Sequence, residues 1–216
     1  MRTFAAKYAL LLLLMFFCID ASAQETPVKK IGKISIGKRK TYTFNRDSVV
    51  NLSIDTLIME DKSTLEFLSA KTASITIGHA IIGKQCIITG TDGKNNGTRF
   101  NIKADFDKLE SLFIVSRGQD YYSRPAFGNG NGGDVKLKYA SGGAKVQTTD
   151  KKSPGYLSIV NTGGGKAVTP QSDLYVIRSR IAMGSGNIGR PLTNLPQGRV
   201  YDGSMGTDGK TSIEKY

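Results

Sequence analysis

The sequence predicts an all-β fold, a single-stranded parallel β-helix or β-solenoid, in which the chain winds through stacked coils. One observation is a ladder of short apolar runs between residues 54 and 115, with no long helical pattern among them. Another is that polar, charged or glycine residues follow each run, as strand connections require. The runs are 54–59, 65–68, 75–77, 86–88, 100–102 and 112–115.

The spacing of the runs favours coils over free hairpins. The first four runs have centres about 10 residues apart, and the later strand centres Ile114, Leu137 and Leu157 are separated by 23 and 20 residues. Coils of that length carry two or three short strands, with glycines at the corners where a positive φ is needed. We expect a right-handed helix, and a β-sandwich is the alternative.

The first 23 residues are typical of a signal peptide. A positive start is followed by the apolar run 9–19 and by Ala21-Ser22-Ala23, a small-residue cleavage pattern. Eleven apolar residues are too few to span a bilayer, which takes about 20. We expect no transmembrane segment after signal removal, and an exported chain that is periplasmic, at the outer cell surface or secreted.

Residues 24–40 form a basic leader, and the exported chain as a whole is basic. Removing Arg2, Lys7 and Asp20 with the signal leaves 28 positive and 17 negative side chains, a net charge of +11. Such a charge favours anionic glycans or other cell-surface polyanions as partners, and solubility is the simpler explanation. The leader itself is either a capping edge strand or a polyanion-binding arm. Its basic residues are Lys29, Lys30, Lys33, Lys38, Arg39 and Lys40.

The predicted solenoid domain covers residues 41–183. Within it, Ile77-Gly78, Ile82-Gly83 and Ile88 resemble rungs of the left-handed hexapeptide β-helix found in many acyltransferases. That pattern lasts for about two rungs, whereas a hexapeptide solenoid needs many, so it indicates solenoid character without the acyltransferase. Residues 184–216 are polar and rich in glycine and proline, and we expect a poorly ordered tail there.

Taken whole, the chain resembles exported glycine-rich β-helix proteins of Gram-negative bacteria. The resemblance rests on Ala21-Ser22-Ala23-Gln24, on the strand ladder, and on the Gly-Asn-Gly-Asn-Gly-Gly-Asp-Val stretch 128–135. It implies an exported, rigid scaffold and carries no catalytic residues that could be transferred to this chain.

Metal and acid–base chemistry have few candidate residues. His79 is the one histidine, and Cys86 is the one cysteine outside the signal, which excludes a His- or Cys-based zinc cluster. Cys86 is expected to be buried in its apolar run. Asp105 and Asp107 stand two apart and are the weak catalytic candidates, as a carboxylate pair of a polysaccharide lyase or hydrolase. Calcium is the one cofactor considered, with Asp92 and Asp134 as weak ligand candidates in glycine-rich turns.

The loop 117–125 is the candidate ligand-binding loop, because Arg117 and Arg124 suit carboxylate or sulfate while Tyr121 and Tyr122 suit a sugar face. The first functional hypothesis is an exported non-catalytic scaffold, a cell-envelope or extracellular structural or adhesion protein. It would bind anionic glycans through this loop and the basic leader. The alternatives are a small polysaccharide lyase or glycoside hydrolase, and a fibre subunit that self-associates through its end coils.

Overall fold

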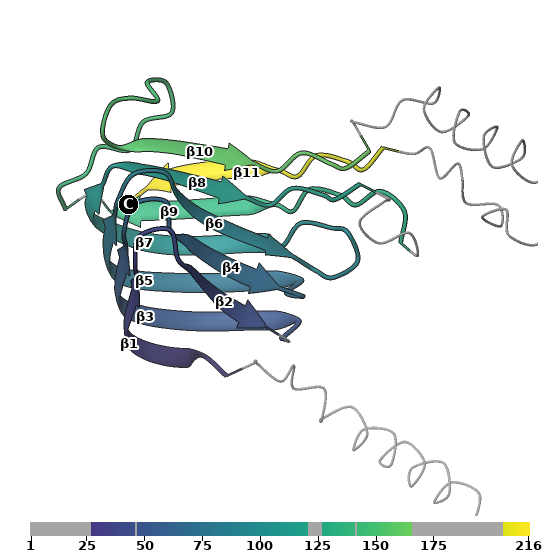
Figure 1. Ribbon diagram of the computed structural model, residues 1–216, viewed down its shortest axis with the longest axis horizontal. Coiled ribbons are helices and arrows are strands. Elements are labelled where there is room, and N and C mark those ends of the chain that lie inside the picture. Colours follow the sequence, from purple (N-terminus) through teal and green to yellow (C-terminus); the bar gives the residue numbers. More distant parts are fainter. Residues whose placement is uncertain (1–26, 46, 121–126, 141, 166–204) are drawn as a thin grey trace, which may run out of the picture.

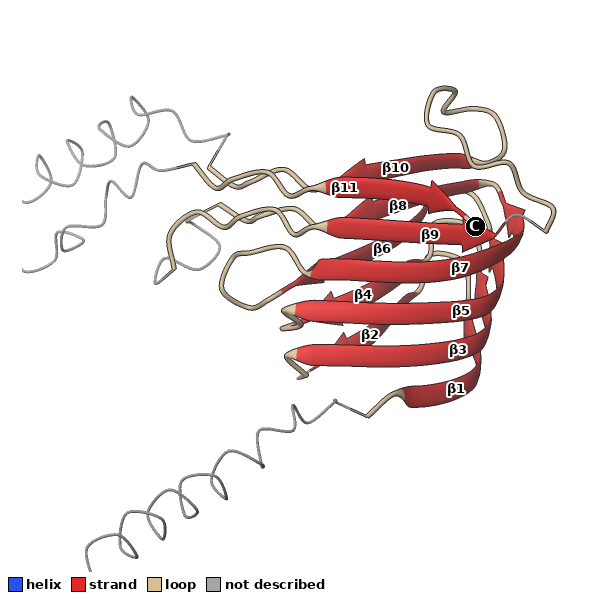
Figure 2. Ribbon diagram, turned by 180° about the vertical axis from the view of Figure 1, so that it is seen from behind, coloured by secondary structure: helices blue, strands red, loops and turns tan. Residues whose placement is uncertain are grey.

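The computed structural model describes residues 27–45, 47–120, 127–140, 142–165 and 205–216. In these residues the regular secondary structure consists of eleven β-strands (Figures 1 and 2). They are β1 (Lys29–Ile36), β2 (Thr41–Asn45), β3 (Val49–Met59), β4 (Thr64–Leu68), β5 (Thr72–Ile82), β6 (Cys86–Thr91), β7 (Arg99–Leu109), β8 (Ser111–Val115), β9 (Val135–Ala140), β10 (Tyr156–Val160) and β11 (Thr211–Lys215).

The strands form two parallel sheets that share successive coils. Sheet A has the order β1-β3-β5-β7-β9-β11, and sheet B has the order β10-β8-β6-β4-β2. The chain therefore alternates between the sheets and rises by one strand in each (Figure 2). This arrangement confirms the predicted β-solenoid. It also excludes the β-sandwich alternative, whose sheets would be antiparallel.

The first coils have a constant length, and the later ones do not. Val49 pairs with Thr72, and Leu65 pairs with Ile88, each 23 residues further along. Beyond them, Phe100 pairs with Val135 and Ile114 pairs with Ile159, so insertions lengthen these coils. The predicted sequence of rungs 114, 137 and 157 was wrong, because β9 belongs to sheet A whereas β8 and β10 belong to sheet B.

The long strands of sheet A bend, and the bend shows in their burial. In β3 the side chains of Leu52 and Ile54 are buried on one arm, and those of Leu57 and Met59 are buried on the other. The three-residue step from Ile54 to Leu57 breaks the two-residue alternation of a straight strand. As a result, Ile77 and Ile82 are both buried on two arms of β5 in a single coil, which confirms the solenoid character predicted for this passage.

The core is built from columns of inward-facing side chains that repeat from coil to coil. In sheet B the ring of Phe44 stacks on that of Phe67, with centroids 5.2 Å apart, and Phe67 meets Phe100 of sheet A edge-on at 5.6 Å. Gly90 occupies the next position of this column. A Cβ at Gly90 would lie 3.1 Å from the ring of Phe100, so the missing side chain leaves room for that ring.

The end of the chain corrects the prediction of a poorly ordered tail. β11 pairs with β9 along its whole length, which makes residues 211–215 the last strand of sheet A. The glycine-rich segments 116–120, 128–134, 161–165 and 205–210 lie side by side beyond the sheets, and we name them the glycine bundle (Figure 1). Residues 184–204 of the predicted tail and the predicted signal peptide lie outside the described residues.

Close backbone contact explains the glycines of this bundle. The N–H of Gly130 donates to the carbonyl of Gln119, that of Gly164 to Gly130, and that of Gly206 to Gly164, over 2.8–3.0 Å. A methyl group on Gly206 would overlap the carbonyl oxygen of Gly130. Because the hydrogen bonds join segments far apart in sequence, the bundle ties the C-terminal residues to the solenoid.

No helix in the part of the chain that the structure describes is long and apolar enough to span a membrane.

Candidate functional site: a basic corner of stacked turns

The turns that lead from sheet A into sheet B are stacked in register. Arg39, Lys62 and Gln85 stand 23 residues apart in successive turns, and all three have a positive φ of 56–61°. Residues other than glycine, asparagine and aspartate seldom adopt this conformation, so its repetition marks one turn geometry used three times. Backbone bonds join the turns: Arg39 N–H donates to the carbonyl of Asp61, and Lys62 N–H donates to that of Lys84.

Side-chain oxygens hold the same turns together. Glu60 accepts the N–H of Lys38 at 2.8 Å, and Asp61 accepts the N–H of Lys84 at 2.8 Å. Behind the third turn the thiol of Cys86 is fully buried and contacts the carbonyl of Glu60 at 3.2 Å. Burial raises the pKa of this thiol. Backbone hydrogen bonds, side-chain carboxylates and the buried thiol therefore hold the turns in place, and the exposed side chains of the turns project from a rigid support.

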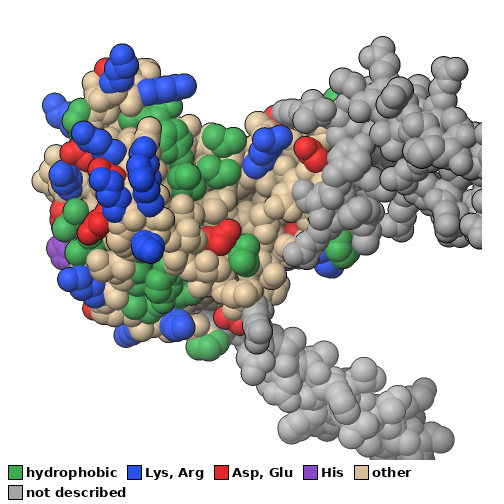
Figure 3. Space-filling view, in the orientation of Figure 1, with side chains coloured by type: hydrophobic (Ala, Val, Ile, Leu, Met, Phe, Trp, Pro, Cys, Tyr) green, Lys and Arg blue, Asp and Glu red, His purple; other side chains and the backbone are tan. Residues whose placement is uncertain are grey.

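Six cationic side chains project from these turns and from the loop before β10, and we name them the basic corner. They line one hollow of about 490 Å³ together with two carboxylates, Asp61 and Glu110. Figure 3 shows Lys and Arg side chains gathered on this side of the molecule, where the strands of sheet B begin. The members are Lys38, Arg39, Lys62, Lys84, Lys151 and Lys152.

The cations of the basic corner are not neutralised by neighbouring acids. Four ion pairs occur among the described residues, and none includes a member of the corner. Asp61 is directed to a backbone N–H, while Glu110 pairs with Lys108 at 3.3 Å. Like charges held within about one Debye length of one another add to a potential that attracts anions. The corner therefore has a positive potential that a polyanion would lower.

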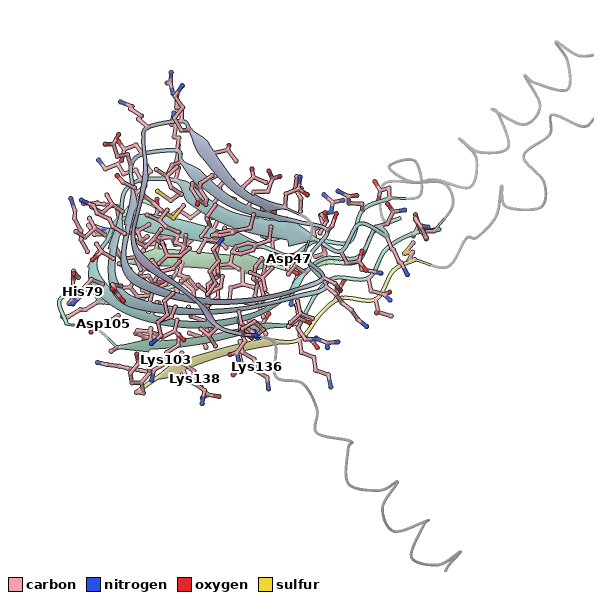
Figure 4. The ribbon with its side chains drawn as sticks, turned by 90° about the horizontal axis from the view of Figure 1, so that it is seen from below. Asp47, His79, Lys103, Asp105, Lys136 and Lys138 are labelled. Atoms are coloured by element: carbon pink, nitrogen blue, oxygen red, sulfur yellow. The ribbon has the colours of Figure 1, made fainter. Side chains whose placement is uncertain are left out.

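The basic side chains on the outer face of sheet A, unlike those of the basic corner, mostly have a partner within the chain. Lys138 pairs with Glu214 at 3.0 Å, and the ammonium of Lys103 lies 4.8 Å from the ring centroid of Tyr216. Arg99 pairs with Asp134 at 3.6 Å. Figure 4 shows Lys103, Lys136 and Lys138 on one side of the sheet. Most of this second set already has a partner within the chain, so the basic corner is the better candidate for a ligand.

The structure separates the basic residues of the leader. Lys38 and Arg39 belong to the basic corner, and Lys40 stands in the same turn but does not line the hollow. Lys29 occupies a core-facing column at the end of the solenoid, with its ammonium 6.0 Å from the ring centroid of Phe44. Lys30 lies on the outer face of sheet A, in register with Ser53. β1 is thus an edge strand, and one end of it reaches the site.

The ligand-binding loop predicted at 117–125 is described only in part. Arg117 is exposed and lines a smaller hollow of about 300 Å³ with Thr89, Thr91 and Asp120. Tyr121, Tyr122 and Arg124 lie outside the described residues. Arg117 is not among the residues of the basic corner, so the two predicted binding elements do not form one site in the described part of the chain.

The carboxylate pair proposed for catalysis does not share an environment. Asp107 contacts the Nδ1 atom of His79 at 3.2 Å, in an ion pair whose side chains are 65% and 44% exposed. Asp105 has a buried Oδ1 atom without a hydrogen-bond partner among the described residues. The register between β5 and β7 shifts at this bend, which turns the two carboxylates into different surroundings. His79 therefore belongs to the bend of β5 and contacts the surface carboxylate of Asp107.

The two calcium candidates also lie apart. Asp92 accepts hydrogen bonds from the backbone of Lys94 and Asn96 within its own turn. Asp134 accepts the N–H of Lys210 at 2.8 Å and pairs with Arg99. Across the described residues no group of three or more His, Cys, Asp or Glu side chains gathers to hold a metal ion. Both carboxylates instead bind backbone amides of turns.

Four members of the basic corner were missed by reasoning from the sequence: Lys62, Lys84, Lys151 and Lys152. Lys62 and Lys84 are isolated in the sequence, and Lys151-Lys152 is a single pair, so none of them marks a site by itself. The signal that identifies Lys62 is the 23-residue period, which places it one coil above Arg39. Comparison with known proteins adds no candidate, because no protein-family model, curated protein or solved structure matches this chain.

Proposed function

We propose that the protein is an exported, non-catalytic scaffold of the cell envelope or extracellular space that binds anionic glycans at the basic corner. The observation that carries the proposal is that four of five consecutive coils contribute cations to one hollow, and none of these cations has an ion-pair partner among the described residues. The rigid turns support this function, because a ligand would find the charges already placed. A structural or adhesive role follows from the same property, since the scaffold would hold a polymer without altering it.

The experiment measures retention of the protein on immobilised polygalacturonate. We expect retention that weakens steeply as salt is raised, because screening shortens the reach of exposed charges. A triple variant with Lys62→Gln, Lys84→Gln and Lys152→Gln should lose most of the retention.

The matched control removes three exposed lysines that do not line the hollow, through Lys71→Gln, Lys94→Gln and Lys136→Gln. Its net charge equals that of the first variant, so a nonspecific charge effect would weaken both equally and would contradict the proposal. Circular dichroism shows whether both variants fold. Tighter binding to duplex DNA than to polygalacturonate at the same salt would also exclude a glycan as the preferred ligand.

A further inference from the structure

The direction of the basic corner constrains how a polymer can lie on it. Its cations come from four of five coils stacked along the solenoid axis, at residues 38–39, 62, 84 and 151–152, and the fourth coil contributes Glu110 and Ser111 instead. Neighbouring parallel strands lie about 4.8 Å apart, so four steps from the first coil to the fifth span about 19 Å. The row of charges therefore runs across the strands.

We infer that an acidic polysaccharide binds lengthwise along this row, parallel to the solenoid axis, with about one sugar residue per coil. A pyranose residue in an extended chain advances by nearly one strand spacing, so the carboxylates of a uronate polymer would recur in register with the coils. The inference rests on the proposed function and adds to it the class of polymer, its direction and the length of its binding site.

The neutral and acidic side chains of the hollow favour a sugar chain over a polyphosphate. Oδ2 of Asp61 has no hydrogen-bond partner among the described residues, and the exposed amide of Gln85 and the hydroxyl of Ser153 also line the hollow. These groups suit a ligand that brings hydroxyl donors between its charges. A polyphosphate offers acceptors alone and could not donate hydrogen bonds to these oxygens.

The match between the spacing of sugar residues and the spacing of strands requires turns that hold their positions. The hydrogen bonds from Arg39 to Asp61 and from Lys62 to Lys84 hold the turns at one strand spacing. Gln85 N–H donates to the hydroxyl of Ser111 at 2.6 Å and extends this link to the fourth coil. The register of the cations therefore does not depend on the ligand.

Titration calorimetry with galacturonate oligomers of increasing length tests the inference on the full exported chain. We expect the affinity to rise about two- to five-fold with each added sugar, the factor that one exposed ion pair supplies. The rise should end at about five sugars, where the oligomer covers the row. An affinity that is independent of length beyond the disaccharide, or that rises without levelling, would overturn the inference.

A pair of variants tests the direction. Removing the last coil's cations with Lys151→Gln and Lys152→Gln should end the rise at about three sugars, because the remaining cations lie in the first three coils, and should leave the affinity for a trimer unchanged. The control variant, Lys71→Gln with Lys136→Gln, should preserve the full rise. Equal weakening at every length would refute lengthwise binding and still leave anionic glycan binding in place, whereas failure of the wild type to bind any uronate polymer would refute the proposed function itself.

Discussion

Substituting Gly206 with alanine should release the end of the chain from the solenoid. Gly206 does not have a positive φ, so alanine fits its backbone conformation, and the effect is one of space alone. The added methyl would lie 2.6 Å from the carbonyl carbon of Gly130 and 3.0 Å from the amide nitrogen of Gly164. Since non-bonded carbon atoms prefer about 3.5 Å, the segment would have to move by at least about 0.9 Å to clear this carbon, and further to clear the carbonyl oxygen of Gly130.

That displacement would break two hydrogen bonds, from Gly206 to Gly164 and from Gly164 to Gly130. At about 1 kcal/mol for each bond, together with 1–3 kcal/mol for forced packing, the local cost is about 3–5 kcal/mol. We expect hydrogen exchange at the amides of β11 to accelerate accordingly, with little change in β3 and β5. The control is Gly32→Ala, whose methyl would lie 4.0 Å from the nearest side chain, that of Asp55. Equal protection of β11 in the two variants would refute the close-packed glycine bundle.

Three further predictions concern the core, the thiol and the carboxylates. Phe67→Ala should lower the free energy of unfolding, measured in urea, by about 3–5 kcal/mol, because the ring is fully buried between the rings of Phe44 and Phe100. The control Tyr42→Ala, at a site that is 40% exposed, should lower it less. Equal losses in the two variants would contradict the column of rings. Cys86 should resist alkylation at pH 8 until urea unfolds the chain, because burial raises the pKa of its thiol. The stability that the neutral thiol contributes is full below the ordinary thiol pKa and declines as the pH rises through the raised pKa. Rapid labelling of the folded protein would contradict both expectations. Bound polygalacturonate should stay intact with or without calcium, measured by the release of reducing ends, and turnover abolished by Asp105→Asn or Asp107→Asn would establish the enzyme alternative.

The strands of the solenoid could be predicted from the sequence because the information is local. Each apolar run of the ladder lies within a strand from β3 to β8, and its alternation sets which side chains are buried. The coil length could not be followed beyond β7 by the same means. The insertions there leave the pairing of Ile114 with Ile159 intact, but they remove any fixed spacing in the sequence.

The C-terminal strand and most of the site depend on contacts between distant segments. Gly206 looks like a residue of a loose tail until its backbone bond to Gly164 is known. Lys84 and Lys152 are ordinary surface lysines in the sequence, and the stacking of coils places them along one hollow. Reasoning from the sequence identified the basic leader and predicted an anionic partner, while the position of the candidate site required the coil register.

Lysine footprinting tests the central claim most directly. The protein is acetylated with and without saturating polygalacturonate, and protection is measured at each lysine by mass spectrometry. We predict joint protection of Lys38, Lys62, Lys84, Lys151 and Lys152, and unchanged reactivity of Lys71, Lys94 and Lys136. Protection concentrated on the outer face of sheet A, or equal protection of all exposed lysines, would contradict a binding site at the basic corner.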